Sequence, residues 1–172
     1  GWAFLPQILL DLGYEGAVMR THHQPAGFPP TYDASMVYWK GPDGSIIPII
    51  PTYSRDNMSQ AHGGMNRGEH DLLHYKDLAK LNAYYDDKKA QGVKYVVLTI
   101  VEDTDLRAIA EGILPQILEV DPRGERYRFV TLEELFDIIP LPDSEEVLEV
   151  QPSDWSFRLN AGYLGDLIPI MT

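Results

Sequence analysis

The chain has 172 residues, 44% of them apolar, and a formal net charge of −12 from 14 basic and 26 acidic residues. That length suits one domain with its own core, and no run reaches the ~18 apolar residues of a membrane span. The acidic excess disfavours nucleic acids and anionic membranes as partners, because both need clustered Lys and Arg. It is compatible with sugars or metal cations, while the lack of Cys excludes disulfides, thiolate zinc sites and cysteine nucleophiles.

The chain begins at Gly1 without Met and shows no signal peptide. We expect a processed chain or a piece of a longer one, soluble and either cytoplasmic or exported. Apolar residues then recur at helical spacing from 4 to 12, and Gly13 ends this predicted helix. A short strand is predicted over 15–19, followed by a loop over 20–33.

A hairpin is predicted next. Residues 36–39 and 45–50 have strand character, and the Gly-Pro-Asp-Gly sequence at 41–44 is a strong turn signal between them. Pro48 has no N–H to donate, so we expect it at a sheet edge or a bulge.

The middle of the chain predicts a loop and then a long helix. Residues 52–68 are polar and Gly-rich, which indicates a surface loop. The apolar spacing predicts a helix over 69–91 that Gly92 ends. The charged residues 86–89, Asp-Asp-Lys-Lys, predict a solvated end of that helix.

The most distinctive segment is 93–105. An unbroken apolar run predicts a strand buried on both faces, and it ends in Glu102, Asp103 and Asp105. Ligand sites of α/β proteins lie at the carboxyl ends of such strands. Glu102 and Asp103 are therefore candidate catalytic residues, with Glu102 as an acid, a base or a substrate hydrogen-bonding group. The alternative is that Asp103 or Thr104 caps the next helix and the other acids meet solvent.

The last third predicts a helix over 104–120, a strand over 126–130 and a helix that begins with a capping box at Thr131. The five residues Leu-Pro-Gln-Ile-Leu occur at 5–9 and again at 114–118. This echo indicates either chance or two equivalent α–β units of one barrel, and the second Pro predicts a kink or a restart of its helix.

Other candidate site residues lie in loops or at strand ends. Arg20, His22 and His23 follow the predicted strand 15–19, and either they contact substrate or they start a polar loop. His22 and His62, the latter in a Gly-rich loop, are candidate metal ligands. Aromatic rings stack on sugars or fill cores, and the candidates for substrate contact are Trp39 and Tyr53. No Gly-x-Gly-x-x-Gly, Walker loop or Gly-x-Ser-x-Gly is present, which disfavours nucleotide binding and serine-hydrolase chemistry.

Several of these segments together resemble a known family. Residues 1–20, Gly-Trp-Ala-Phe-Leu-Pro-Gln to Ala-Val-Met-Arg, resemble the segment after the catalytic motif of family 38 glycoside hydrolases, the α-mannosidase type. The segment 39–54, with Gly-Pro-Asp-Gly and then Pro-Thr-Tyr-Ser, is similar to a hairpin of that family. The segments 95–102, 114–118 and 127–135 resemble the last strands of the wider glycoside hydrolase/deacetylase barrel.

The resemblance covers roughly residues 1–140. It implies an α/β fold that is part of an irregular seven-stranded β/α barrel, with 141–172 as a linker and the start of a following segment. It also implies a retaining glycosidase with an Asp nucleophile and a divalent metal, commonly zinc. The family's His-x-Asp motif is absent and its nucleophile would precede Gly1, so we expect the chain to be an inactive fragment of the catalytic domain.

The expected partners are a carbohydrate substrate and either the rest of its own polypeptide or further copies of the chain. Two alternatives stay open, a metal-dependent polysaccharide deacetylase and a non-catalytic carbohydrate-binding or scaffold protein.

Overall fold

The structure is a computed structural model, and it describes residues 2–19, 31–54, 56, 58–60, 66–68, 72, 75–99 and 112–149. In these ranges an open four-stranded mixed sheet is combined with four α-helices. The α/β class is therefore confirmed, whereas a closed seven-stranded barrel is not seen in the described ranges. No helix within them is long and apolar enough to cross a membrane.

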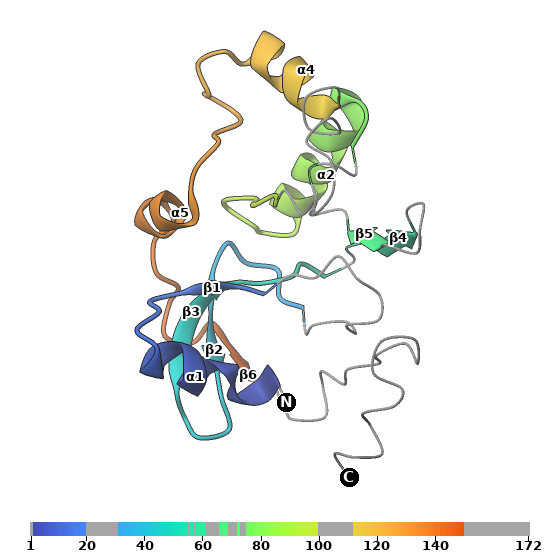
Figure 1. Ribbon diagram of the computed structural model, residues 1–172. Coiled ribbons are helices and arrows are strands. Elements are labelled where there is room, and N and C mark those ends of the chain that lie inside the picture. Colours follow the sequence, from blue (N-terminus) through green and yellow to red (C-terminus); the bar gives the residue numbers. More distant parts are fainter. Residues whose placement is uncertain are drawn as a thin grey trace, which may run out of the picture.

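The sheet has the strand order β1-β3-β2-β6 (Figure 1). β2 (Val37–Lys40) and β3 (Ile46–Ile50) form the predicted antiparallel hairpin. On the outer sides, β1 (Ala17–Val18) runs parallel to β3, and β6 (Val147–Glu149) runs parallel to β2. Gly44 has φ +90°, a conformation that glycine adopts without strain, so the predicted turn sequence closes the hairpin.

Pro48 lies in an interior strand, so the prediction of an edge or a bulge is wrong. It pairs in register with Tyr38 of β2. On the other side of β3, Ile50 O accepts a hydrogen bond from Met19 N–H. Because backbone groups alternate along a strand, the nitrogen of Pro48 faces this same side, where pairing with β1 begins only at Ile49. The missing N–H therefore leaves the pairing with β2 intact.

Two helices cover the two faces of the sheet. A 3-10 turn, η1 (Trp2–Phe4), leads into α1 (Leu5–Asp11), and Gly13 with φ +82° follows the helix as predicted. α1 packs through Leu5 and Leu9 on one face, whose buried residues are Val37, Trp39, Ile47 and Ile49. α5 (Leu132–Ile138) packs on the other face, around Met36, Ile50, Val97 and Ile139.

A second core lies between α2 (Leu78–Ala90) and α4 (Ile113–Val120). α2 begins nine residues later than the predicted start at 69, because the Asp77 side chain accepts from Lys80 N–H at 2.9 Å and caps it there. Gly92, with φ +97°, ends it as predicted. α4 starts at Ile113 with Pro115 in its first turn, where proline is tolerated, and residues 104–111 of that predicted helix lie outside the described residues.

Three predictions of strand or loop are corrected. Residues 93–98 and 126–130 are irregular rather than strands, and the predicted loop 52–68 contains β4 (Met58–Gln60) paired with β5 (Asn66–Gly68). In both irregular segments side chains take the backbone N–H groups that a strand ladder would use. Val97 N–H donates to the Tyr53 hydroxyl, and Tyr127 N–H donates to the Asp121 carboxylate. Thr99 O accepts a hydrogen bond from Leu72 N–H at 2.8 Å, and residues 100–105 lie outside the described residues.

Candidate functional site

The carboxyl ends of the two parallel strands β1 and β3 lie side by side. Met19, directly after β1, donates its N–H to Ile50 O at 2.9 Å. Thr52, two residues after β3, donates its hydroxyl to Met19 O at 2.6 Å. We call this region, Met19, residues 52–54 and Asp56, the carboxyl edge. Ligands of α/β proteins bind at such an edge, which makes it the candidate functional site.

Most of the sequence-predicted site residues lie outside the described part of the chain, namely Arg20, His22, His23, His62, Glu102, Asp103 and Asp105. Three of them, Arg20 to His23, follow Met19 of the carboxyl edge in the sequence.

Trp39 and Tyr53, the aromatic candidates for substrate contact, are both buried. Trp39 is 1% exposed and lies in the core beneath α1, while Tyr53 is 0% exposed and lies in the second core. The structure does not bring them together, and neither ring offers a face at the surface of the described chain. Their packing corresponds to the core alternative that the sequence left open.

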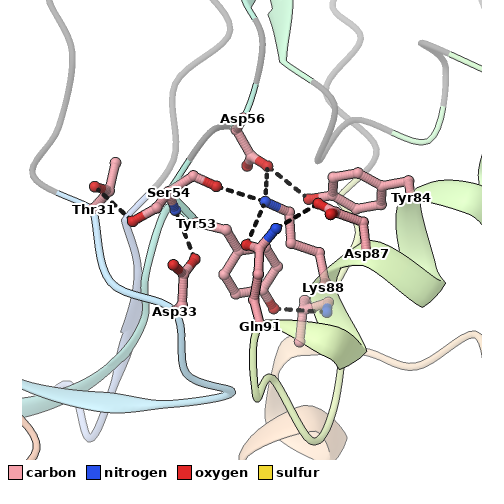
Figure 2. A network of polar contacts seen from close by, with 10 residues as sticks. Thr31, Asp33, Tyr53, Ser54, Asp56, Tyr84, Asp87, Lys88 and Gln91 are labelled. Carbon is pink, nitrogen blue, oxygen red and sulfur yellow. Dashed lines mark hydrogen bonds and ion pairs between the residues drawn. The ribbon is translucent and has the colours of Figure 1, made fainter.

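The main feature that the sequence did not predict is a buried lysine beside the carboxyl edge. The Lys88 side chain of α2 is 0% exposed, although residues 86–89 were predicted to be a solvated helix end. Its Nζ donates to Ser54 O at 2.6 Å and to Gln91 Oε1 at 3.3 Å, and it lies 3.3 Å from Asp56 Oδ1 (Figure 2). The Asp56 side chain is itself only 2% exposed.

Two tyrosines complete the surroundings of the ammonium group. Nζ lies 5.7 Å from the ring centroid of Tyr53 and 5.4 Å from that of Tyr84, within the range of cation–π attraction. The Tyr84 hydroxyl donates to Asp56 Oδ1 at 3.0 Å. We call Tyr53, Ser54, Asp56, Tyr84, Lys88 and Gln91 the Lys88 cluster. Its buried charges are paired and hydrogen-bonded, which is the condition for keeping them away from water.

Further contacts tie the Lys88 cluster to neighbouring segments. Ser54 N–H donates to Asp33 Oδ1 at 2.8 Å, and the Ser54 and Thr31 hydroxyls are 3.2 Å apart. Gln91 Nε2 donates to Asp87 Oδ2, also on α2 (Figure 2). The segment after β3 is thus held from the side of Thr31–Asp33 and from the side of α2.

One signal in the sequence points to the burial of Lys88. Leu81, Tyr84 and Lys88 are spaced i, i+3 and i+7, so they share one face of an α-helix. Leu81 and Tyr84 are buried, and Lys88 continues their stripe. A lysine on a core-facing stripe needs a carboxylate partner, but the partner Asp56 comes from a segment that the sequence presented as a polar loop.

The enclosed ammonium group has no access to solvent, so it orders protein groups rather than attacking or binding a solute. Among the described residues no three His, Cys, Asp or Glu side chains gather as a metal site, so they do not supply the ligand set that the resemblance implies. Comparison of the chain with protein-family models, curated proteins and solved structures found no match.

Proposed function

We propose that the chain is part of a carbohydrate-active hydrolase, a glycosidase of the α-mannosidase type. In this proposal the sheet belongs to an irregular seven-stranded β/α barrel of the glycoside hydrolase/deacetylase kind. The observation that supports it most is the carboxyl edge, where β1 and β3 end side by side and polar residues follow each strand. These residues are Arg20, His22 and His23 after β1, and Ser54 and Asp56 after β3.

The segment that carries much of the family resemblance leads to this edge. Residues 39–54 contain the turn of the β2–β3 hairpin and β3 itself, and they finish at Ser54 on the carboxyl edge. The net charge of −12 also suits a neutral sugar better than an anionic substrate.

The chemistry proposed is cleavage of a glycosidic bond by two carboxyl groups, one of which protonates the leaving oxygen. Glu102 and Asp103 are the candidates that this chain offers. A divalent metal, with zinc expected, belongs to the proposal through the resemblance. Since the described residues form no metal-ligand set, we assign no step to the metal.

The test is hydrolysis of 4-nitrophenyl α-mannoside and of an N-acetylated oligosaccharide by the protein from the full reading frame that encodes this chain. We expect free sugar from the first substrate and no acetate from the second. Glu102→Gln should lower kcat by at least about 100-fold if Glu102 is the general acid. Glu119→Gln, an exposed position on α4, is the matched control and should leave kcat unchanged.

Release of acetate without sugar would replace the glycosidase by the deacetylase alternative. Sugar binding by calorimetry without turnover of either substrate would point to the non-catalytic binding protein. The 172-residue chain, assayed in parallel, is expected to be inactive, and mannoside turnover by it alone would overturn that expectation.

A further inference from the structure

We propose that Lys88 is a positioning residue of the carboxyl edge, and that its ammonium group fixes the backbone after β3 at Ser54. What this edge then binds rests on the proposed function. The positioning itself follows from the contacts of the Lys88 cluster alone.

Lys88 contacts the main chain of the carboxyl edge directly. Lys88 Nζ is 2.6 Å from the carbonyl oxygen of Ser54, and the N–H of the same residue donates to the Asp33 carboxylate. Both backbone groups of Ser54 are thus bonded to side chains from other segments. The location of Ser54 is therefore set by where these side chains lie.

An apolar side chain at position 88 would fill the same space but would not bind the Ser54 carbonyl oxygen. Lys88 continues the buried stripe of Leu81 and Tyr84, and burying an ion pair stabilises a fold no better than well-packed apolar residues of similar volume. An ammonium group differs in that it binds a carbonyl and a carboxylate at defined distances. Its specific effect is therefore geometric.

The position of Ser54 also affects the end of β1, through Thr52. Thr52 precedes the segment held by Lys88, and its hydroxyl donates to Met19 O, directly before Arg20. A shift of Tyr53 and Ser54 would be transmitted through Thr52 to the end of β1. Lys88 therefore bears on both halves of the carboxyl edge.

The decisive variant is Lys88→Met combined with Asp56→Leu, which replaces the ion pair by two apolar side chains. We expect it to unfold at a higher temperature than Lys88→Met alone, because the single variant leaves a buried carboxylate without its cation. In the double variant, amide hydrogen exchange at Ser54 should be at least about tenfold faster than in the wild type. Exchange at Tyr38, whose N–H donates to Glu146 O in the sheet, should change less than about threefold.

Lys89→Met is the matched control, because Lys89 is the exposed neighbour of Lys88 on the same helix. It should change neither the unfolding temperature nor the exchange at Ser54. A folded double variant with wild-type exchange at Ser54 would overturn the proposal, because Lys88 would then only fill the core.

A measurement on the wild-type protein is independent of any variant. In a nitrogen-15 NMR spectrum of the lysine side chains, we expect the ammonium hydrogens of Lys88 to exchange with water at least about tenfold more slowly than those of Lys89. Equal exchange at the two lysines would overturn the proposal even where both variants fail to fold.

The hydrolysis assay separates this inference from the proposed function. A full-length enzyme carrying the double substitution should lose at least about tenfold in kcat/KM at a temperature where it is folded, because small displacements of site residues are costly in catalysis. If the wild type hydrolyses neither glycoside nor acetylated sugar, the proposed function fails, and the exchange at Ser54 still decides the role of Lys88.

Discussion

Two ion pairs of this chain show how burial changes the contribution of a Lys–carboxylate contact to stability. Lys40 Nζ and Glu149 Oε1 are 2.8 Å apart, yet their side chains are 42% and 55% exposed. Such a surface pair contributes about 0–1 kcal/mol. Lys88 and Asp56 are 3.3 Å apart but almost completely enclosed, and removing one partner of such a pair costs about 3–5 kcal/mol. The longer distance therefore belongs to the pair that matters more for the fold.

Asp121 gives the loop after α4 a dependence on pH. The N–H groups of Tyr127, Glu125 and Arg126 donate to its carboxylate and hold its pKa below the ordinary range. A lowered pKa in the folded state means that the stabilisation is present above the unfolded-state pKa, at about pH 4, and is lost as the pH falls further.

Asp121→Asn should therefore lower the unfolding temperature at pH 7, and the difference from the wild type should shrink by about pH 3. Thermal unfolding followed by circular dichroism at the two pH values measures this. Glu119→Gln, which removes one exposed negative charge from α4, is the control. A difference that stays constant between the two pH values would contradict the role given to the carboxylate.

Glycine is needed at position 16 because the Phe136 ring lies too close for a Cβ atom, and not because of the φ angle. A Cβ at this position would lie 2.5 Å from Cε1 of Phe136, on the helix that covers this face of the sheet. Gly16→Ala should thus displace the ring and destabilise the protein by about 1–3 kcal/mol in urea unfolding. With Phe136→Leu as the background, the same substitution should cost clearly less. Equal costs in both backgrounds would show that the ring is not the obstacle.

At the scale of elements, the sequence predicted best those features that depend on neighbouring residues. α1, the β2–β3 hairpin and the capping box of α5 depend on caps, turns and short periodicities, and all three are seen. The strands predicted within 93–105 and over 126–130 would need their backbone N–H groups to pair with a neighbouring strand. Distant or neighbouring side chains take those groups, and apolar periodicity carries no information about that competition.

The capping box of α5 is a local feature with a measurable contribution. The Thr131 hydroxyl accepts from Glu134 N–H, and the Glu134 carboxylate accepts from Thr131 N–H at 2.8 Å. Thr131→Ala should cost about 0.5–2 kcal/mol in denaturant unfolding, whereas Thr131→Ser keeps the acceptor and should stay close to the wild type. If both substitutions cost the same, the methyl group rather than the cap would be responsible.

At the scale of the whole molecule, the sheet and the second core are connected where β3 ends. Ile50, the last residue of β3, belongs to the core beneath α5, whereas Tyr53 belongs to the core between α2 and α4. Val97 N–H of the α5-side core donates to the Tyr53 hydroxyl, and Lys88 of α2 donates to Ser54 O. The sequence predicted a site at the end of a strand within 93–105, but residues 93–98 are irregular, and the parallel strands whose carboxyl ends lie side by side are β1 and β3. It did not predict the Lys88 cluster, because Asp56 and Lys88 are brought together only by the packing of α2 against the segment after β3.

The position of β6 in the sheet bears on where the folding unit ends along the chain. The sequence placed a boundary near residue 140, yet β6 pairs with β2, Tyr38 N–H donates to Glu146 O, and Leu148 packs against the core beneath α1. A chain that ends at residue 140 should lose this contact and expose β2 as an edge strand.

We expect the chain that ends at residue 140 to be less stable than one that ends at residue 150 by at least about 2 kcal/mol, from one partly buried leucine and the ladder hydrogen bonds. Urea unfolding of the two shortened chains measures the difference, and the chain ending at residue 150 is the matched control because it keeps β6. Equal midpoints would mean that β6 adds nothing to the sheet and that the boundary near 140 holds. A lower midpoint for the shorter chain alone would place the end of the folding unit after β6, because only residues 141–150 differ between the two.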